Sequence, residues 1–256
     1  MQIKIIYEQP LNERIRTFLR LEHLFKITNH HIKGLSEWDN RAAITNLLNI
    51  VDLLSRSDIK SDIIKELERH SSTLNALSDN PGVDTERLAI ILQSITSILE
   101  SLKKSSYQPG QVIKQDDFIN FIKQRNMIPG GSCNFDLPNY HYWLHKPEEE
   151  RQKDINNWYS DLKLINDGVK LALNMIRNSA NPVIEHAQSG FYQKPIEPNL
   201  SCHLLRIILP IESRYYPEIS GGKHRFTVRF MEQSSTRSRP VQSQENIEFE
   251  LHCCIL

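Results

Sequence analysis

The sequence predicts an α+β protein in which a mainly helical domain is followed by a β-strand domain. Three observations predict it: an isoleucine-rich segment opens the chain, apolar residues then recur at helical spacing, and period-two alternation replaces that spacing after Asn181. Helices and strands occur in separate runs rather than in βαβ units, so segregated layers are expected. We predict domains at 11–180 and at 1–10 plus 181–256, with the first strand joining the C-terminal sheet.

The first strand and four helices follow from local patterns. Segment 2–7 is short, isoleucine-rich and ends before Pro10, which favours a strand. Residues that can cap a helix precede the first, second and fourth helices, at Asn12, Ser36 and Asp84. The apolar stripes of the four helices are Ile15, Phe18, Leu19 and Leu24; Ile44, Leu47, Leu48, Val51 and Leu54; Ile63, Leu67, Leu74 and Leu77; and Leu88, Ile91, Leu92, Ile95, Leu99 and Leu102.

Further helices are predicted before residue 181. One runs from Asp116 to Arg125 and ends before the turn at 129–131. Another follows Pro147, where three glutamates favour a helix N-terminus. Its apolar stripe reaches Ile176, which fits one long helix or two abutting ones.

Alternating apolar residues predict three strands in the last quarter of the chain. Between the second and third of them lies the tract 233–246, rich in Ser, Gln and Arg, for which we expect a long mobile loop. The alternating residues are Leu205, Ile207 and Leu209; Phe226, Val228 and Phe230; and Ile247, Phe249 and Leu251.

Composition excludes several classes of protein. Lys plus Arg and Asp plus Glu both number 31, so no global charge draws the chain to nucleic acid or anionic lipid. No apolar run approaches the ~20 residues that span a bilayer, and segment 1–7 lacks the features of a secretory signal. The cysteines are sparse and two are adjacent, at Cys133, Cys202, Cys253 and Cys254. We expect a soluble protein of the reducing cytoplasm.

No pattern predicts catalysis or a cofactor. The turn at 129–131 lacks the lysine of a phosphate-binding loop, and Ser189-Gly190 lacks the second glycine of a nucleophile elbow. His141 and His145 stand four apart, as zinc ligands do on a helix, but Tyr142 replaces the glutamate of a metalloprotease. We expect a binding protein with no metal, and a structural metal is the alternative.

The strand around Phe226 carries a local excess of positive charge. Alternation turns Lys223, Arg225 and Arg229 outward. Residues 201–240 include seven Lys or Arg and three acids, although the chain as a whole is neutral. Spacing alone fits a partner-binding face and ordinary cross-strand pairs with Glu248 and Glu250 equally well. A module that binds single-stranded nucleic acid through the same strand is the alternative function.

A series of motifs, in order, resembles the ZapD family of bacterial cell-division proteins over essentially the whole chain. The motifs are Glu8-Gln9-Pro10-Leu11-Asn12-Glu13 with Arg16 and Leu19-Arg20; Ile128-Pro129-Gly130-Gly131 with Phe135-Asp136-Leu137-Pro138; His141-Tyr142-Trp143-Leu144-His145; Gly190-Phe191-Tyr192-Gln193; Tyr216-Pro217-Glu218-Ile219-Ser220-Gly221; Lys223-His224-Arg225-Phe226 with Arg229-Phe230-Met231; and Phe249-Glu250-Leu251 before Cys253-Cys254.

The resemblance implies a helical domain joined to a β-strand domain, a symmetric homodimer and no catalysis. It also implies that the protein binds the C-terminal tail of FtsZ and cross-links FtsZ filaments at the mid-cell division site. The tail-binding surface of the family is basic and lies near the junction of the two domains. The positions that carry over to this sequence are Arg20, His141, Lys223, Arg225 and Arg229.

One position departs from the family pattern. Asp117 stands where some relatives carry an arginine, in the helix before the Pro-Gly-Gly turn. The helical side of the site therefore needs another cation, and Lys114 and Lys123 are the candidates.

Overall fold

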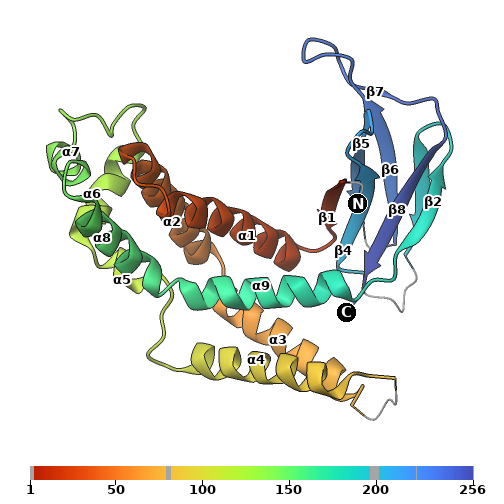
Figure 1. Cartoon of the computed structure of the whole chain (residues 1–256), viewed down its shortest axis with the longest axis horizontal. Helices are drawn as coiled ribbons and strands as arrows, with labels where there is room; N and C mark the ends of the chain where they lie inside the picture. Colours follow the sequence, from red (N-terminus) through yellow and green to blue (C-terminus); the bar gives the residue numbers. More distant parts are fainter. Residues whose placement is uncertain (1–2, 79–81, 197–201, 223, 256) are drawn as a thin grey trace. The chain divides into compact units, whose positions relative to one another are not determined.

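The computed structural model describes residues 3–78, 82–196, 202–222 and 224–255, and it is an α+β protein, as predicted (Figure 1). The chain divides into two compact units. Phe18–Ala172 form one, which we call the helical unit. Met1–Thr17 and Leu173–Leu256 form the other, which we call the sheet unit.

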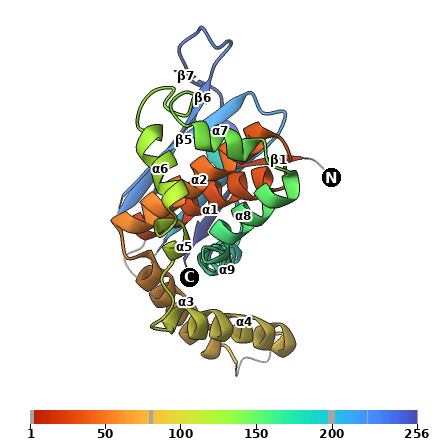
Figure 2. The same cartoon turned by 90° about the vertical axis from the view of Figure 1, so that its left-hand side faces the viewer.

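The helices occupy the central part of the chain, and α3 and α4 lie side by side as a hairpin in both views (Figures 1 and 2). After Pro147 the structure has two helices rather than one, with a break at residues 161–162. The bounds are α1 (Glu13–Ile32), α2 (Glu37–Arg56), α3 (Ile59–Asn75), α4 (Thr85–Lys103), α5 (Gln111–Lys114), α6 (Asp117–Asn126), α7 (Pro138–Leu144), α8 (Glu148–Ser160) and α9 (Lys163–Asn178).

Side-chain caps fix where the helices begin. The Asn12 side-chain oxygen accepts a hydrogen bond from the Ile15 N–H at 2.9 Å. Ser36 caps α2 and Asp84 caps α4 in the same way. Each cap satisfies a backbone N–H that has no partner within the first turn of a helix. The three predicted caps are confirmed.

An aromatic cluster forms one end of the core of the helical unit. Phe118 of α6 contacts Tyr140 and Trp143 of α7 and Trp158 of α8, with ring centroids 5.7–6.0 Å apart. The indole N–H of Trp158 donates to Asp116 at 2.8 Å, so the polar edge of a buried ring has a partner. The cluster fixes α7, a short helix, against α6 and α8.

The sheet unit is built from two antiparallel sheets. One has the strand order β1-β4-β8-β2 and the other β3-β6-β5, with β7 paired to β6. The first strand does join the C-terminal sheet, because β1 pairs with β4 along its whole length. The bounds are β1 (Lys4–Pro10), β2 (Val183–Ala187), β3 (Phe191–Pro195), β4 (Leu204–Pro210), β5 (Tyr215–Gly221), β6 (Arg225–Glu232), β7 (Val241–Gln242) and β8 (Ile247–Cys254).

The predicted alternation places the core between the two sheets. Side chains of β4, β6 and β8 are buried in one cluster, with Phe230 and Phe249 in ring contact at 5.0 Å. Strand β4 departs from simple alternation, since Leu204 and Ile208, on its other face, are also buried. The expected long loop at 233–246 is partly wrong, because β7 lies within it.

Two sequence features weighed as sites form turns instead. Ser189 and Gly190 both have positive φ, and the Phe191 N–H donates to the Gln188 carbonyl at 2.9 Å, as in a two-residue hairpin turn. Gly131 packs so closely on the end of α6 that a Cβ would lie 2.2 Å from the Arg125 carbonyl oxygen. Gly190 and Gly131 are therefore needed for the backbone conformation and close packing of these turns, and no bound ligand is required to explain them.

Candidate functional site

Strand β6 is the central strand of its sheet, and its outward face carries two exposed arginines. Arg225 and Arg229 point away from the core, whereas Phe226 and Val228, which lie between them, point into it. In the antiparallel register, Arg229 lies between Phe191 of β3 and Glu218 of β5, and Arg225 lies opposite Pro195. The structure therefore brings these two predicted residues onto one surface. Lys223 lies outside the described residues.

The alternative that these arginines pair with Glu248 and Glu250 is wrong. Both glutamates belong to β8, in the other sheet. The Glu250 carboxylate accepts hydrogen bonds from Lys4 at 2.6 Å and His252 at 2.7 Å. In the described part of the chain, neither Arg225 nor Arg229 has an ion pair within 4.0 Å. Spacing along the sequence could not reveal this, because it does not show which strands share a sheet.

Neighbouring strands add side chains that charge patterns alone did not select. Phe191, directly beside Arg229, is 39% exposed and offers an apolar contact on the same face. Tyr216 lies opposite Met231 on the strand at the other side. Glu218 is exposed opposite Arg229, so the positive potential is stronger near Arg225. The only sequence signal for these residues was their place in the quoted motifs.

In the helical unit, Arg20 lines a shallow pocket of about 360 Å³ between α1 and α2. His23 and Arg56 line the same pocket and were not predicted as site residues. All three side chains are exposed. They come together because Arg20 and His23 lie about one helical turn apart, facing the end of α2. His141 does not line this pocket.

Among the described residues that line the Arg20 pocket, the one acid is Asp52, and it is already paired with a lysine. Lys123 of α6 donates a hydrogen bond to the Asp52 carboxylate at 2.6 Å. Lys123 therefore contributes a cation beside the pocket, whereas Lys114 lines a different one. Asp117 is exposed in the first turn of α6, where its charge favours the helix dipole.

His141 lies in α7 and is half-buried. Its ring lies 4.4 Å from the His145 ring, and its backbone carbonyl contacts the His145 Nδ1 at 2.8 Å. Among the described residues, no three His, Cys, Asp or Glu side chains gather as a metal site. Nor does any helix in the described ranges have the length and apolar character needed to cross a membrane.

Comparisons with known proteins agree on one family. Residues 19–229 match the model of a family described as ZapD, cell division protein. A protein of Methylococcus capsulatus is 41% identical over 256 residues, which cover all of both chains. One of Nitrosomonas eutropha is 38% identical and one of Azoarcus sp. 35%, each over 98% of this chain and 100% of its own. All three are named cell division protein ZapD, a name that denotes no enzyme.

Proposed function

Because this chain belongs to the ZapD family of cell division proteins, we propose that it binds the C-terminal tail of FtsZ and, as a homodimer, cross-links FtsZ filaments into bundles. It acts in the cytoplasm at the mid-cell division site, and its role includes no catalytic step. The tail is bound as a short disordered segment that carries carboxylates and apolar side chains.

The exposed arginines of β6 carry this proposal. A guanidinium that is not paired with a carboxylate of its own protein can form charge-assisted hydrogen bonds with a carboxylate of the tail without first breaking an ion pair. Arg225 meets that condition fully, whereas Glu218 lies opposite Arg229 and weakens its field. Phe191 supplies an apolar contact next to the charges. Arg225 is therefore the main anchor for a tail carboxylate.

The pocket around Arg20 is a second proposed tail contact, on the helical unit. Arg20 and Arg56 supply two guanidinium groups, and the Lys123–Asp52 pair leaves the pocket with net positive charge. Lys123 thus takes the place of the cation that Asp117 does not provide. His141 is retained from the motif match as a third contributor of the helical unit.

Bundling follows from two tail sites in one dimer. A single contact between a short tail and a few arginines is weak, because ordering the disordered tail costs free energy. A filament displays many tails, so a bivalent dimer gains effective concentration at its second site. A monomeric variant is therefore expected to bind tails without bundling filaments.

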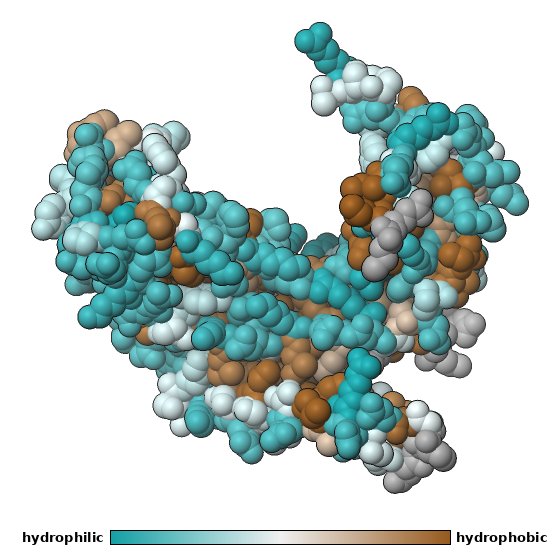
Figure 3. All heavy atoms as spheres, viewed as in Figure 1, coloured by the Kyte–Doolittle hydropathy of each residue, from teal (hydrophilic) through white to brown (hydrophobic). Residues whose placement is uncertain are grey.

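Exposed apolar side chains at one end of the helical unit support the homodimer. Met127, Phe135 and Tyr142 are 70–86% exposed, in and around the connection from α6 to α7. Arg41 donates to the Ser132 carbonyl in that connection at 3.2 Å and also lies over the ring of Trp38. Apolar residues at the surface of this end are visible in Figure 3. A second copy of the chain would remove them from water.

Co-sedimentation with FtsZ polymers tests the proposal. The full chain is expected to pellet with FtsZ and not with FtsZ that lacks its C-terminal tail. Arg225→Glu should abolish pelleting, and Arg229→Glu should weaken it less. Arg237→Glu is the matched control, since this arginine is exposed in the loop between β6 and β7. Undiminished pelleting of a folded Arg225→Glu variant would refute the β6 site.

Two further measurements separate the parts of the proposal. Arg20→Glu and His141→Ala, assayed for tail-peptide binding, test the helical contributors independently of β6. A mobility-shift assay with random oligonucleotides tests the nucleic-acid alternative, for which no binding at physiological salt is expected.

A further inference from the structure

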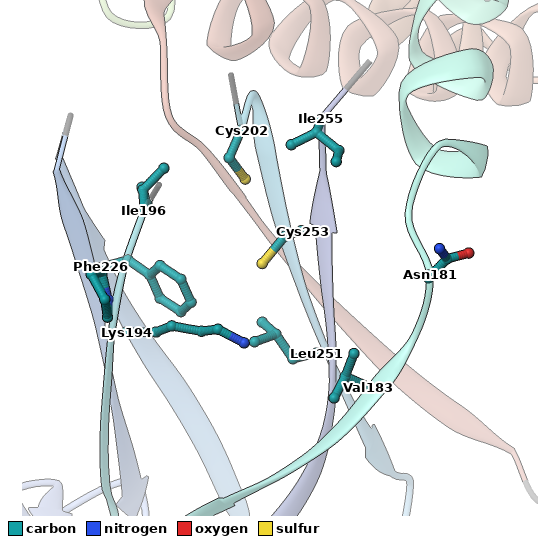
Figure 4. A pocket seen from close by; sticks show the side chains of 10 residues that line it. Asn181, Val183, Lys194, Ile196, Cys202, Phe226, Leu251, Cys253 and Ile255 are labelled. Atoms are coloured by element: carbon teal, nitrogen blue, oxygen red, sulfur yellow. The ribbon is translucent and has the colours of Figure 1, made fainter. Parts of the chain in front are cut away.

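A pocket of about 220 Å³ at one end of the β sandwich contains two cysteine side chains (Figure 4). Cys253 belongs to β8 in one sheet, and Cys202 lies two residues before β4 in the same sheet. Lys194 and Phe226 approach from the opposite sheet, on β3 and β6. Figure 4 shows both sulfur atoms directed into the space between the sheets.

The two thiols line the same pocket. The Cys202 thiol donates a hydrogen bond to the Leu204 carbonyl at 3.7 Å, and it lies close enough to the Cys253 thiol for the two to shift each other's pKa. Cys253 lies opposite Leu205, and Cys202 lies three residues before Leu205 along the chain. Cys254, the next residue, points to the other face of the strand and is fully buried. Of the two adjacent cysteines, Cys253 is therefore the one that shares the pocket with Cys202.

The environment gives the two thiols different reactivity. The neighbouring Cys202 thiol lowers the pKa of Cys253, and the Lys194 ammonium acts in the same direction, while burial and Glu185 oppose them. The neighbouring Cys253 thiol raises the pKa of Cys202, as does burial. Lys194 is held by a hydrogen bond to Glu185 at 2.9 Å. Cys253 is therefore the nucleophile, and Cys202 keeps its proton until a later step.

We propose that Cys253 and Cys202 form a thiol–disulfide exchange site for a low-molecular-weight disulfide. The pocket is smaller than the ~300 Å³ at which sites for drug-sized ligands begin, so it admits only a small reagent. Its lining is mainly apolar, with one lysine. All four cysteines are unbridged in the structure.

The exchange has two balanced steps. The Cys253 thiolate attacks one sulfur of the small disulfide, forming a mixed disulfide and releasing one small thiolate, which takes up a proton. The Cys202 sulfur then attacks the Cys253 sulfur, loses its own proton and releases the second small thiol. Two protein thiols are oxidised to one disulfide, and one small disulfide is reduced to two thiols. The two sulfur atoms must approach each other to form a bond of ~2.05 Å.

The test uses the full chain with Cys133→Ser, which removes the exposed cysteine. The protein is treated with hydroxyethyl disulfide, quenched with acid and analysed by peptide mass spectrometry. A Cys202–Cys253 bridge is expected, with loss of two hydrogen atoms and release of two small thiols. Adding Cys202→Ser should stop the reaction at a mixed disulfide on Cys253. Adding Cys253→Ser should slow modification of Cys202 at least tenfold.

Two controls make the result decisive. Adding Cys254→Ser should leave the bridge unchanged. In urea, the reaction should lose its selectivity for Cys253 over Cys254, because the unfolded chain lacks the pocket that brings Cys253 and Cys202 together. The proposal is overturned if no Cys202–Cys253 bridge forms, if Cys202 reacts as fast without Cys253, or if the same selectivity persists in urea.

Discussion

Arg177, in the last turn of α9, donates two hydrogen bonds to the carboxylate of Glu8 in β1, at 2.8 and 2.7 Å. Arg206 of β4 donates to the same carboxylate at 3.1 Å. Glu8 opens the first of the motifs that relate the chain to its family, and its role is structural. It joins the end of a helix to two adjacent strands of the sheet unit.

Replacing Glu8 with alanine should destabilise the protein by about 2–3 kcal/mol. The change leaves two partly buried guanidinium groups without their acceptor, and such a loss costs more than breaking an exposed ion pair. Thermal or urea denaturation measures the effect. Glu212→Ala, at an exposed turn, should stay within about 0.5 kcal/mol of the wild type. An equal effect of the two substitutions would contradict this role of Glu8.

Asn12 has two roles that a pair of substitutions can separate. Its side-chain oxygen caps α1, and its side-chain nitrogen lies 2.9 Å from the His203 ring. Asn12→Ala removes both contacts and should cost about 1–2 kcal/mol. Asn12→Asp keeps the cap oxygen and should cost less in urea denaturation. If the two variants are equally unstable, the contact with His203 dominates and the cap contributes little.

The strands that could be predicted from the sequence are those that sit centrally in a sheet. Alternation identified β4, β6 and β8, which have a neighbour on each side and bury one face in the shared core. Strands β2, β3 and β5 lie at sheet edges or contain proline, and their exposed positions mask the alternation. The edge strand β1 was recognised by its isoleucines, and it continues to Pro10 because an edge tolerates a missing N–H.

The site was predictable only in part, for a related reason. Alternation along the sequence showed that Arg225 and Arg229 face outward, because that pattern does not depend on which strands pair with β6. Whether Glu248 and Glu250 pair with them depends on sheet assignment, which is a long-range property. The cluster of Arg56 and Lys123 near Arg20 likewise depends on how α1, α2 and α6 pack. The Asp52–Lys123 pair spans 71 positions, so no local pattern contains it.

The Glu250 carboxylate should give the protein a pH-dependent increment of stability. Its hydrogen bond from the Lys4 ammonium, followed by that from His252, lowers the pKa of Glu250 below its ordinary value. A depressed pKa in the folded state means that the stabilisation is present above the unfolded value of ~4.3 and is lost as pH falls through the folded value.

Comparison of the wild type with Glu250→Gln tests that dependence. The difference between their urea midpoints should be constant from pH 5 to 6, about one unit or more above the unfolded pKa, and should shrink as the pH falls below ~4. Glu248→Gln is the matched control. Glu248 lies in the same strand, but its nearest ionic partner is an exposed His186 at 4.0 Å, so its carboxylate lacks the short contacts that Glu250 has. A gap between wild type and Glu250→Gln that widens in acid would have the wrong sign for this mechanism.

Binding of an FtsZ tail peptide should weaken as salt concentration rises, because the proposed contacts are between exposed charges. The screening length falls from ~10 Å at 0.1 M salt to ~3 Å at 1 M. Fluorescence anisotropy with a labelled tail peptide measures the affinity without the salt dependence of filament assembly. Arg225→Gln should reduce both the affinity and its dependence on salt, whereas Arg237→Gln should change neither. If binding is equally strong at all salt concentrations, apolar contacts around Phe191 carry the recognition and the arginines do not.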